Sequence, residues 1–174
     1  MKWYTYITFL LLLFTQHDNG DWFFQFDKIH HYQDPDGHFF DFLPVNDTVQ
    51  TELEKFGYSI FGEGKPYSLK DTAFIDSLIL IGFEQINMSP SKESDINHIY
   101  KERYADLTGP RLGSYCLPNF TDILIFKKQG KITGISKVCF GCSHISIVGT
   151  DKFTAAFGEN GEYQQLEKVL YDKE

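Results

Sequence analysis

Two strand-like runs separated by a short turn constrain the fold of this chain most strongly. The runs at 121–126 and 132–138 are rich in β-branched and other apolar residues, and a polar segment that contains glycine separates them. Runs of this kind around a glycine-bearing turn are typical of a β-hairpin. A turn at 129–130 sets the register of the hairpin and places Asp122 opposite Lys137.

The cysteines of the chain, Cys116, Cys139 and Cys142, flank this hairpin. The same register places Cys116 opposite Ser143 and therefore close to Cys142. Opposed Cα atoms in an antiparallel pair lie about 4.5 to 5.5 Å apart, a separation that a disulfide spans. Pro118 cannot donate to a sheet ladder, so regular pairing is expected to weaken before it reaches Cys116.

The first residues have the pattern of a secretory signal peptide. A basic start is followed by a short apolar stretch at 7–14 and then by polar residues. That stretch is too short for a comfortable transmembrane helix, which needs about 20 apolar residues. We therefore expect 1–17 to be a signal peptide, or else an uncleaved membrane-targeting anchor because no small-x-small cleavage pattern is present. Membrane contact is expected through this segment alone.

The remaining residues, 18–174, are expected to form a single domain in the periplasm or at the cell surface. Hydrophobic residues make up 42% of the chain, and 17 Phe and 10 Tyr provide large apolar areas for a core. The formal net charge is −8, and the lysines are scattered rather than clustered. Phosphate backbones are bound by basic surfaces, so nucleic acid is not an expected partner.

The pattern along the chain predicts an α+β fold, with an antiparallel sheet built from N- and C-terminal hairpins and three to four short helices. A first hairpin is expected from the alternating residues 22–26, a turn at 34–37 and a return strand at 38–43. A first helix is expected from a cap at 47–48 to a stop at Gly57 or Gly62, and a second from a cap at 68–71 to Gly82. A third helix is expected after Ser89-Pro90-Ser91 and a last one after Asn160-Gly161. The run at 143–148 is expected to extend the sheet.

The cysteine cluster has four interpretations. An exported protein favours a structural disulfide between Cys116 and one member of the Cys139/Cys142 pair, which leaves one thiol over and needs no cofactor. Adding His144 gives the ligand set of a Cys3His zinc site. A thiol-disulfide redox centre is the third interpretation, although the motif follows a strand and not a helix N-terminus. The fourth is three buried, reduced cysteines.

A second candidate metal site involves the histidines near the N-terminus. If 34–37 form the turn of the first hairpin, His31 and His38 become diagonal neighbours on one sheet face, where two imidazoles can share a metal ion. The register fixes no third ligand. An ordinary solvated hairpin tip is the favoured interpretation of this stretch.

The cysteine-bearing hairpin region begins with Tyr115-Cys116-Leu117-Pro118, continues through the turn at 128–131, and ends with Val138-Cys139-Phe140-Gly141-Cys142. This region resembles a pattern in small exported proteins of Bacteroidetes. The similarity extends from Tyr115 to the C-terminal helix. It implies an exported location and a shared cysteine arrangement, and it implies no activity. Many such proteins carry a lipoprotein cysteine after the leader, and this chain has none there.

Two classes of function follow from the sequence. The preferred hypothesis is a non-enzymatic exported domain with a cysteine-stabilised hairpin, whose aromatic-rich sheet contacts a protein or small-molecule partner, because no complete catalytic set is visible. The alternative is a zinc-binding or thiol-redox protein that uses Cys116, Cys139 and Cys142, with His144 as a further ligand. The sequence identifies neither a substrate nor a catalytic residue.

Overall fold

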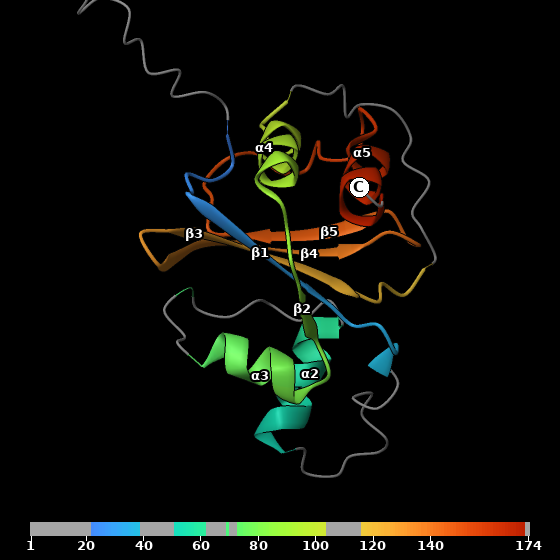
Figure 1. Cartoon of the computed structure of the whole chain (residues 1–174). Coiled ribbons are helices and arrows are strands. Elements are labelled where there is room, and N and C mark those ends of the chain that lie inside the picture. Colours follow the sequence, from blue (N-terminus) through green and yellow to red (C-terminus); the bar gives the residue numbers. More distant parts are fainter. Residues whose placement is uncertain (1–21, 39–50, 62–68, 70–72, 104–115, 173–174) are drawn as a thin grey trace, which may run out of the picture.

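A computed structural model describes residues 22–38, 51–61, 69, 73–103 and 116–172. Within these residues the chain forms an α+β fold with an antiparallel five-stranded sheet and four helices (Figure 1), which confirms the predicted class. The strands are β1 (Lys28–Gln33), β2 (Glu84–Ile86), β3 (Asp122–Lys128), β4 (Lys131–Cys139) and β5 (His144–Val148). The helices are α2 (Glu52–Phe61), α3 (Phe74–Leu80), α4 (Pro90–Ile99) and α5 (Glu162–Tyr171).

The strands lie in the order β2-β1-β3-β4-β5, and every neighbouring pair is antiparallel. The predicted C-terminal hairpin is β3–β4, and Lys128 pairs with Lys131 across a two-residue turn. Gln129 and Gly130 both have positive φ, 51° and 76°. This is the backbone that a tight type I′ hairpin turn requires, so the predicted turn is confirmed.

The predicted register of this hairpin is wrong by one residue beyond the turn. Phe126 pairs with Gly134 while Lys127 pairs with Ile132, so Thr133 is an extra residue, a β-bulge. Its hydroxyl donates to the backbone oxygens of Phe126 and Gln25 at 3.2 and 3.1 Å. Because of the bulge, Asp122 lies opposite Val138 and not Lys137.

The N-terminal part of the sheet differs from the predicted first hairpin. The strand is Lys28–Gln33 and not 22–26, where Trp22 makes only an isolated bridge to Lys101. At its C-terminal end β1 is paired on one side with β2 and on the other with β3. The expected return strand falls mainly on 39–43, outside the described residues. β2 was not predicted from the sequence.

The helix boundaries follow from their caps. α4 starts at Pro90, within the Ser89-Pro90-Ser91 segment that was predicted to precede it, and the Ser89 side chain accepts from the backbone N–H of Lys92. α2 starts later than predicted, after a capping box in which Glu54 accepts from the backbone of Thr51 at 2.6 Å and Thr51 accepts from the backbone of Glu54 at 3.2 Å. Gly57 lies inside α2 and does not end it.

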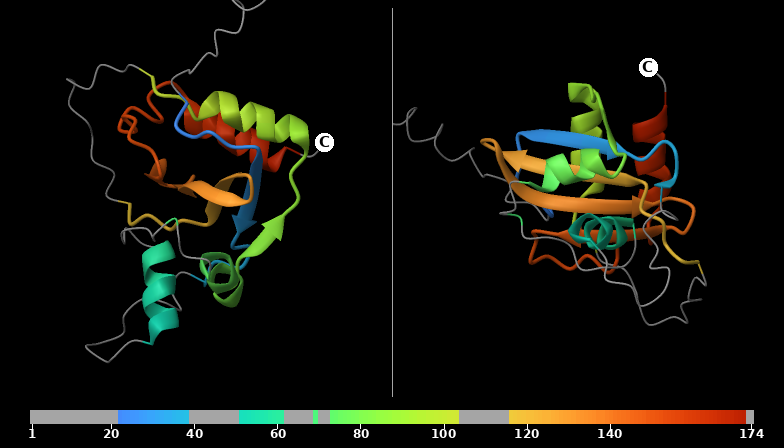
Figure 2. Two further views of the ribbon diagram at one scale, coloured as in Figure 1. Left: turned by 90° about the vertical axis from the view of Figure 1, so that its left-hand side faces the viewer. Right: turned by 90° about the horizontal axis from the view of Figure 1, so that it is seen from below.

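Side chains that alternate along the strands build one hydrophobic core on each face of the sheet. The ribbons show α4 and α5 on one face, and α2 and α3 on the other (Figure 2). Leu124 and Phe126 of β3 pack under α4 and α5, whereas Ile123 and Ile125 pack against α2 and α3. The ring of Phe24 occupies the space that a side chain at Gly134 would need, so this position of β4 requires a glycine. The aromatic residues of the central strands, Tyr32 of β1 and Phe126 of β3, are buried in these cores.

A buried lysine links the sheet to α2. The side chain of Lys137 is almost fully buried, and its Nζ donates to the backbone oxygens of Ser59 at 2.8 Å and Ile60 at 3.1 Å. The ammonium group also lies 4.4 Å from the centre of the Phe120 ring. A cation at the last turn of a helix compensates the carbonyl groups that have no partner within the helix.

No helix among the described residues is long and apolar enough to cross a membrane. The predicted leader at 1–17 lies outside those residues.

Candidate functional site

Two of the cysteines form a disulfide. Cys116 and Cys142 are bonded, 26 residues apart in sequence, with their Cα atoms separated by 5.7 Å. Cys142 lies in the turn that joins β4 to β5, which is closed by a hydrogen bond from Ser143 N–H to the Phe140 oxygen. The disulfide between Cys116 and one member of the pair is thereby confirmed, and the partner is Cys142.

The third cysteine is placed differently. Cys139 is the last residue of β4, carries a free thiol, and is 5% exposed. Cys116, by contrast, is exposed and Cys142 is partly exposed. Cys139 is therefore buried, whereas the Cys116–Cys142 disulfide lies at the surface.

His144, the fourth ligand of the zinc interpretation, pairs with Cys139 across the β4–β5 turn. Its ring centre lies 5.7 Å from that of Phe120. Within the described part of the chain no group of three or more His, Cys, Asp or Glu side chains is arranged to hold a metal ion. With two of the sulfurs bonded to each other, the Cys3His set is not assembled in this form of the protein.

The two histidines of the N-terminal prediction bind different carboxylates. His31 Nε2 lies 2.8 Å from Asp122 Oδ1, and His38 Nδ1 lies 2.7 Å from Asp34 Oδ1. Asp34 also accepts from the backbone N–H groups of Gly37 and His38. Asp34 therefore has the turn role expected of it. His31 and His38 each contact a carboxylate, and the predicted pairing of the two imidazoles is not seen.

The polar cluster around Asp122 was missed by sequence reasoning. The Asp122 carboxylate is fully buried and accepts from His31, from the Tyr171 hydroxyl at 2.8 Å, and from the Thr121 hydroxyl at 3.1 Å. The Tyr171 hydroxyl in turn accepts from Gln33 Nε2 at 3.0 Å. A charged residue at the start of an apolar run, as in Thr-Asp-Ile-Leu-Ile-Phe, was the one sequence signal of this cluster.

The chemistry of this cluster is structural in the described state. Burial, and then the nearby Asp122 carboxylate, raise the pKa of Tyr171 well above its ordinary value. The phenol therefore stays protonated and donates to the carboxylate. The cluster joins the end of α5 to β1 and β3, and His31 within it is only 2% exposed.

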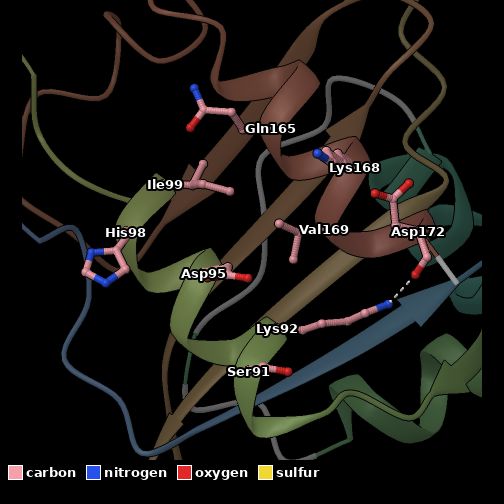
Figure 3. Close-up of a pocket in the computed structure, with 9 residues that line it drawn as sticks. All are labelled: Ser91, Lys92, Asp95, His98, Ile99, Gln165, Lys168, Val169 and Asp172. Carbon is pink, nitrogen blue, oxygen red and sulfur yellow. Dashed lines mark hydrogen bonds between the residues drawn. The ribbon is translucent and has the colours of Figure 1, made fainter. Parts of the chain in front are cut away.

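A groove of about 470 Å³ lies between α4 and α5 (Figure 3). It is lined by Ser91, Lys92, Asp95, His98, Ile99, Gln165, Lys168, Val169 and Asp172. The helices run in opposite directions, so the start of α4 faces the end of α5. Lys92 reaches across the groove and donates to the backbone oxygen of Asp172 at 3.0 Å.

The lining combines apolar and charged groups. Ile99 and Val169 provide apolar surface between the helices, while Lys168 and Asp95 place both signs of charge at the sides. Next to the groove, the ring of Trp22 lies 5.7 Å from that of His98, and Lys101 Nζ lies 3.6 Å from the Trp22 ring centre. Ile99 itself is 4% exposed, so the apolar surface open to solvent at the base of the groove comes mainly from Val169.

Comparisons with known proteins add little. No protein-family model and no solved structure matches the chain. L-saccharopine oxidase from Schizosaccharomyces pombe is 28% identical over 116 residues, which are 67% of this chain and 24% of the oxidase. This chain thus spans about a quarter of the length of that relative, and the similarity places it in no family.

Proposed function

We propose that this protein is an exported, non-enzymatic interaction domain that binds a segment of a partner protein in the groove between α4 and α5. The observation that carries the proposal is the groove itself, with Ile99 and Val169 at its base and charges of both signs at its rim. A groove between two helices accepts a peptide segment through apolar anchors, and the rim charges select its orientation.

Export is supported by the signal-peptide pattern of 1–17, by the disulfide between Cys116 and Cys142, and by the resemblance to exported proteins of Bacteroidetes. The disulfide joins the segment before β3 to the β4–β5 turn. The groove is formed by α4 and α5, and both helices lie outside the loop from Cys116 to Cys142 that the disulfide closes.

Site-specific photocrosslinking in the source cell tests the groove. A photoreactive residue is introduced at Gln165, which lines the groove, and separately at Gln164, which is exposed on the same helix but does not line it. The proposal predicts a discrete crosslinked protein from position 165 and none from position 164. Equal adducts at both positions, or none at 165, contradict it.

Charge reversal provides the matched control. Asp95→Arg changes the rim of the groove, whereas Glu167→Arg makes the same change of charge at an exposed position of α5 that does not line it. Asp95→Arg is expected to abolish the adduct at position 165, and Glu167→Arg to preserve it. Circular dichroism on both variants verifies that the fold is retained.

A further inference from the structure

The surface position of the disulfide points to a function separate from the groove. We infer that the Cys116–Cys142 disulfide is a reversible thiol-disulfide centre that an external thiol opens from solvent while the domain remains folded. This inference does not rest on the proposed partner groove, and its failure leaves that proposal unaffected.

Access to the sulfurs is the first argument. Cys116 is exposed, and the adjacent Leu117 has 66% of its surface in solvent. On the other side, Gly141 in the β4–β5 turn is exposed and Cys142 is partly exposed. Thiol-disulfide exchange requires a thiolate to reach one of the bonded sulfurs, and this surface lets it reach Cys116. An exposed apolar residue beside an exposed disulfide also suits the docking of a thiol-bearing partner.

The second argument is that contacts other than the disulfide hold in place the two segments that carry Cys116 and Cys142. On the Cys116 side, Phe120 is fully buried and its backbone N–H donates to the Phe61 oxygen at 3.1 Å. On the Cys142 side, the turn is closed by the hydrogen bond from Ser143 to Phe140. These contacts keep the two sulfurs near each other after the bond is broken, so it can form again without refolding.

The reaction is balanced as follows. An external thiolate attacks Sγ of Cys116, the bond to Cys142 breaks, and its electron pair leaves on Sγ of Cys142, which takes up a proton. A second thiolate attacks the external sulfur of the mixed disulfide and releases Cys116 as a thiol. Two external thiols are oxidised to one disulfide, and the Cys116–Cys142 disulfide is reduced to two thiols.

Cys139 is excluded from the reaction by its position. Cys139 is 5% exposed, and its backbone is paired in the β4–β5 ladder opposite His144. An external thiolate or alkylating reagent therefore does not reach it in the folded protein. The centre consequently behaves as a two-sulfur site within a three-cysteine sequence.

The oxidised protein is treated with reduced glutathione in native buffer, and samples are quenched with iodoacetamide for intact-mass and peptide analysis. The inference predicts a glutathione adduct at Cys116, followed by alkylation of Cys116 and Cys142 with Cys139 unlabelled and an unchanged far-ultraviolet spectrum. Opening is expected to be at least on the order of tenfold faster than global unfolding measured in the same buffer.

Low concentrations of urea separate local from global opening. A rate that rises in step with the unfolding equilibrium, or a labelled Cys139 in every opened molecule, overturns the inference because the bond then opens only through unfolding. Cys139→Ser serves as the matched variant and is expected to leave the opening rate unchanged. A substantially altered rate in this variant also overturns the two-sulfur assignment.

Discussion

The hydroxyl group of Tyr171 lies 2.8 Å from both carboxylate oxygens of Asp122, 49 residues away in sequence. Tyr171 is the last residue of α5, and Asp122 is the first residue of the central strand β3. This contact joins the C-terminal helix to the centre of the sheet. It also gives a buried carboxylate one of the donors that make its burial tolerable.

Removing that hydroxyl is expected to destabilise the fold. Tyr171→Phe deletes a hydrogen bond to a charged, fully buried group, so the free energy of unfolding is predicted to fall by about 1.5 to 3 kcal/mol in urea titrations. Tyr58→Phe is the control, since Tyr58 is also 43% exposed and makes no such contact with a carboxylate of the described residues. Equal losses in the two variants contradict the assigned role of the Tyr171–Asp122 bond.

Stability is also predicted to fall at alkaline pH. Burial, and then Glu162, raise the pKa of Tyr163 to about 12, and burial raises the pKa values of Tyr100 and Tyr171 as well. A folded state with raised pKa values holds these protons more tightly than the unfolded chain, which releases them near pH 10. The stabilisation is therefore fully present below about pH 10 and is lost as the pH rises toward the folded values.

Urea titrations between about pH 9 and pH 11 measure this dependence. Tyr163→Phe removes one of the three groups and is expected to lose less stability over that interval than the wild type. An identical decrease in both proteins shows that Tyr163 does not contribute to it.

The buried lysine provides a third prediction. Lys137→Met keeps an unbranched stem but removes the ammonium group and leaves the Ser59 and Ile60 carbonyls without this donor, at an expected cost of about 1 to 3 kcal/mol. Hydrogen exchange should accelerate in α2 more than in α5. Lys131→Met, an exposed change on the same strand, is expected to have little effect. Uniform acceleration in both helices is inconsistent with a local role for Lys137.

The disulfide is expected to stabilise the domain without being needed for its fold. Because it joins residues 26 apart, a Cys116→Ser/Cys142→Ser double variant is predicted to lose about 3 kcal/mol of unfolding free energy and to keep its circular dichroism spectrum. Cys139→Ser, a change at the thiol that is not bonded, tests whether any cysteine loss has the same effect. A double variant that is unfolded contradicts the independence of the sheet from the disulfide.

Sequence reasoning was most successful where short-range chemistry decides the structure. The turn at Gln129 and Gly130 and the start of α4 near Ser89 follow from local patterns. The turn then brings Cys116 near Cys142, although the predicted register was wrong by one residue. The added residue at Thr133 was not visible, because a bulge depends on contacts such as the one between its hydroxyl and Gln25, 108 positions away.

The Asp122 cluster was missed for a related reason. Asp122 and His31 are 91 residues apart, and β1 reaches Asp122 only because it is inserted between β2 and β3. That insertion reflects long-range strand pairing, which residue periodicity within β1 does not specify. The groove between α4 and α5 depends on the same tertiary arrangement, so its residues could be assigned to helices from the sequence but not to a common site.

The state of the cysteines in protein exported by its native route tests the central claim most directly. Intact mass is measured under native conditions and again after alkylation with and without prior reduction. An exported domain with a disulfide-stabilised hairpin predicts a Cys116–Cys142 disulfide, one thiol at Cys139 that is alkylated only after unfolding, and no bound metal. Three alkylatable thiols together with one bound zinc ion would contradict the account and establish the zinc interpretation.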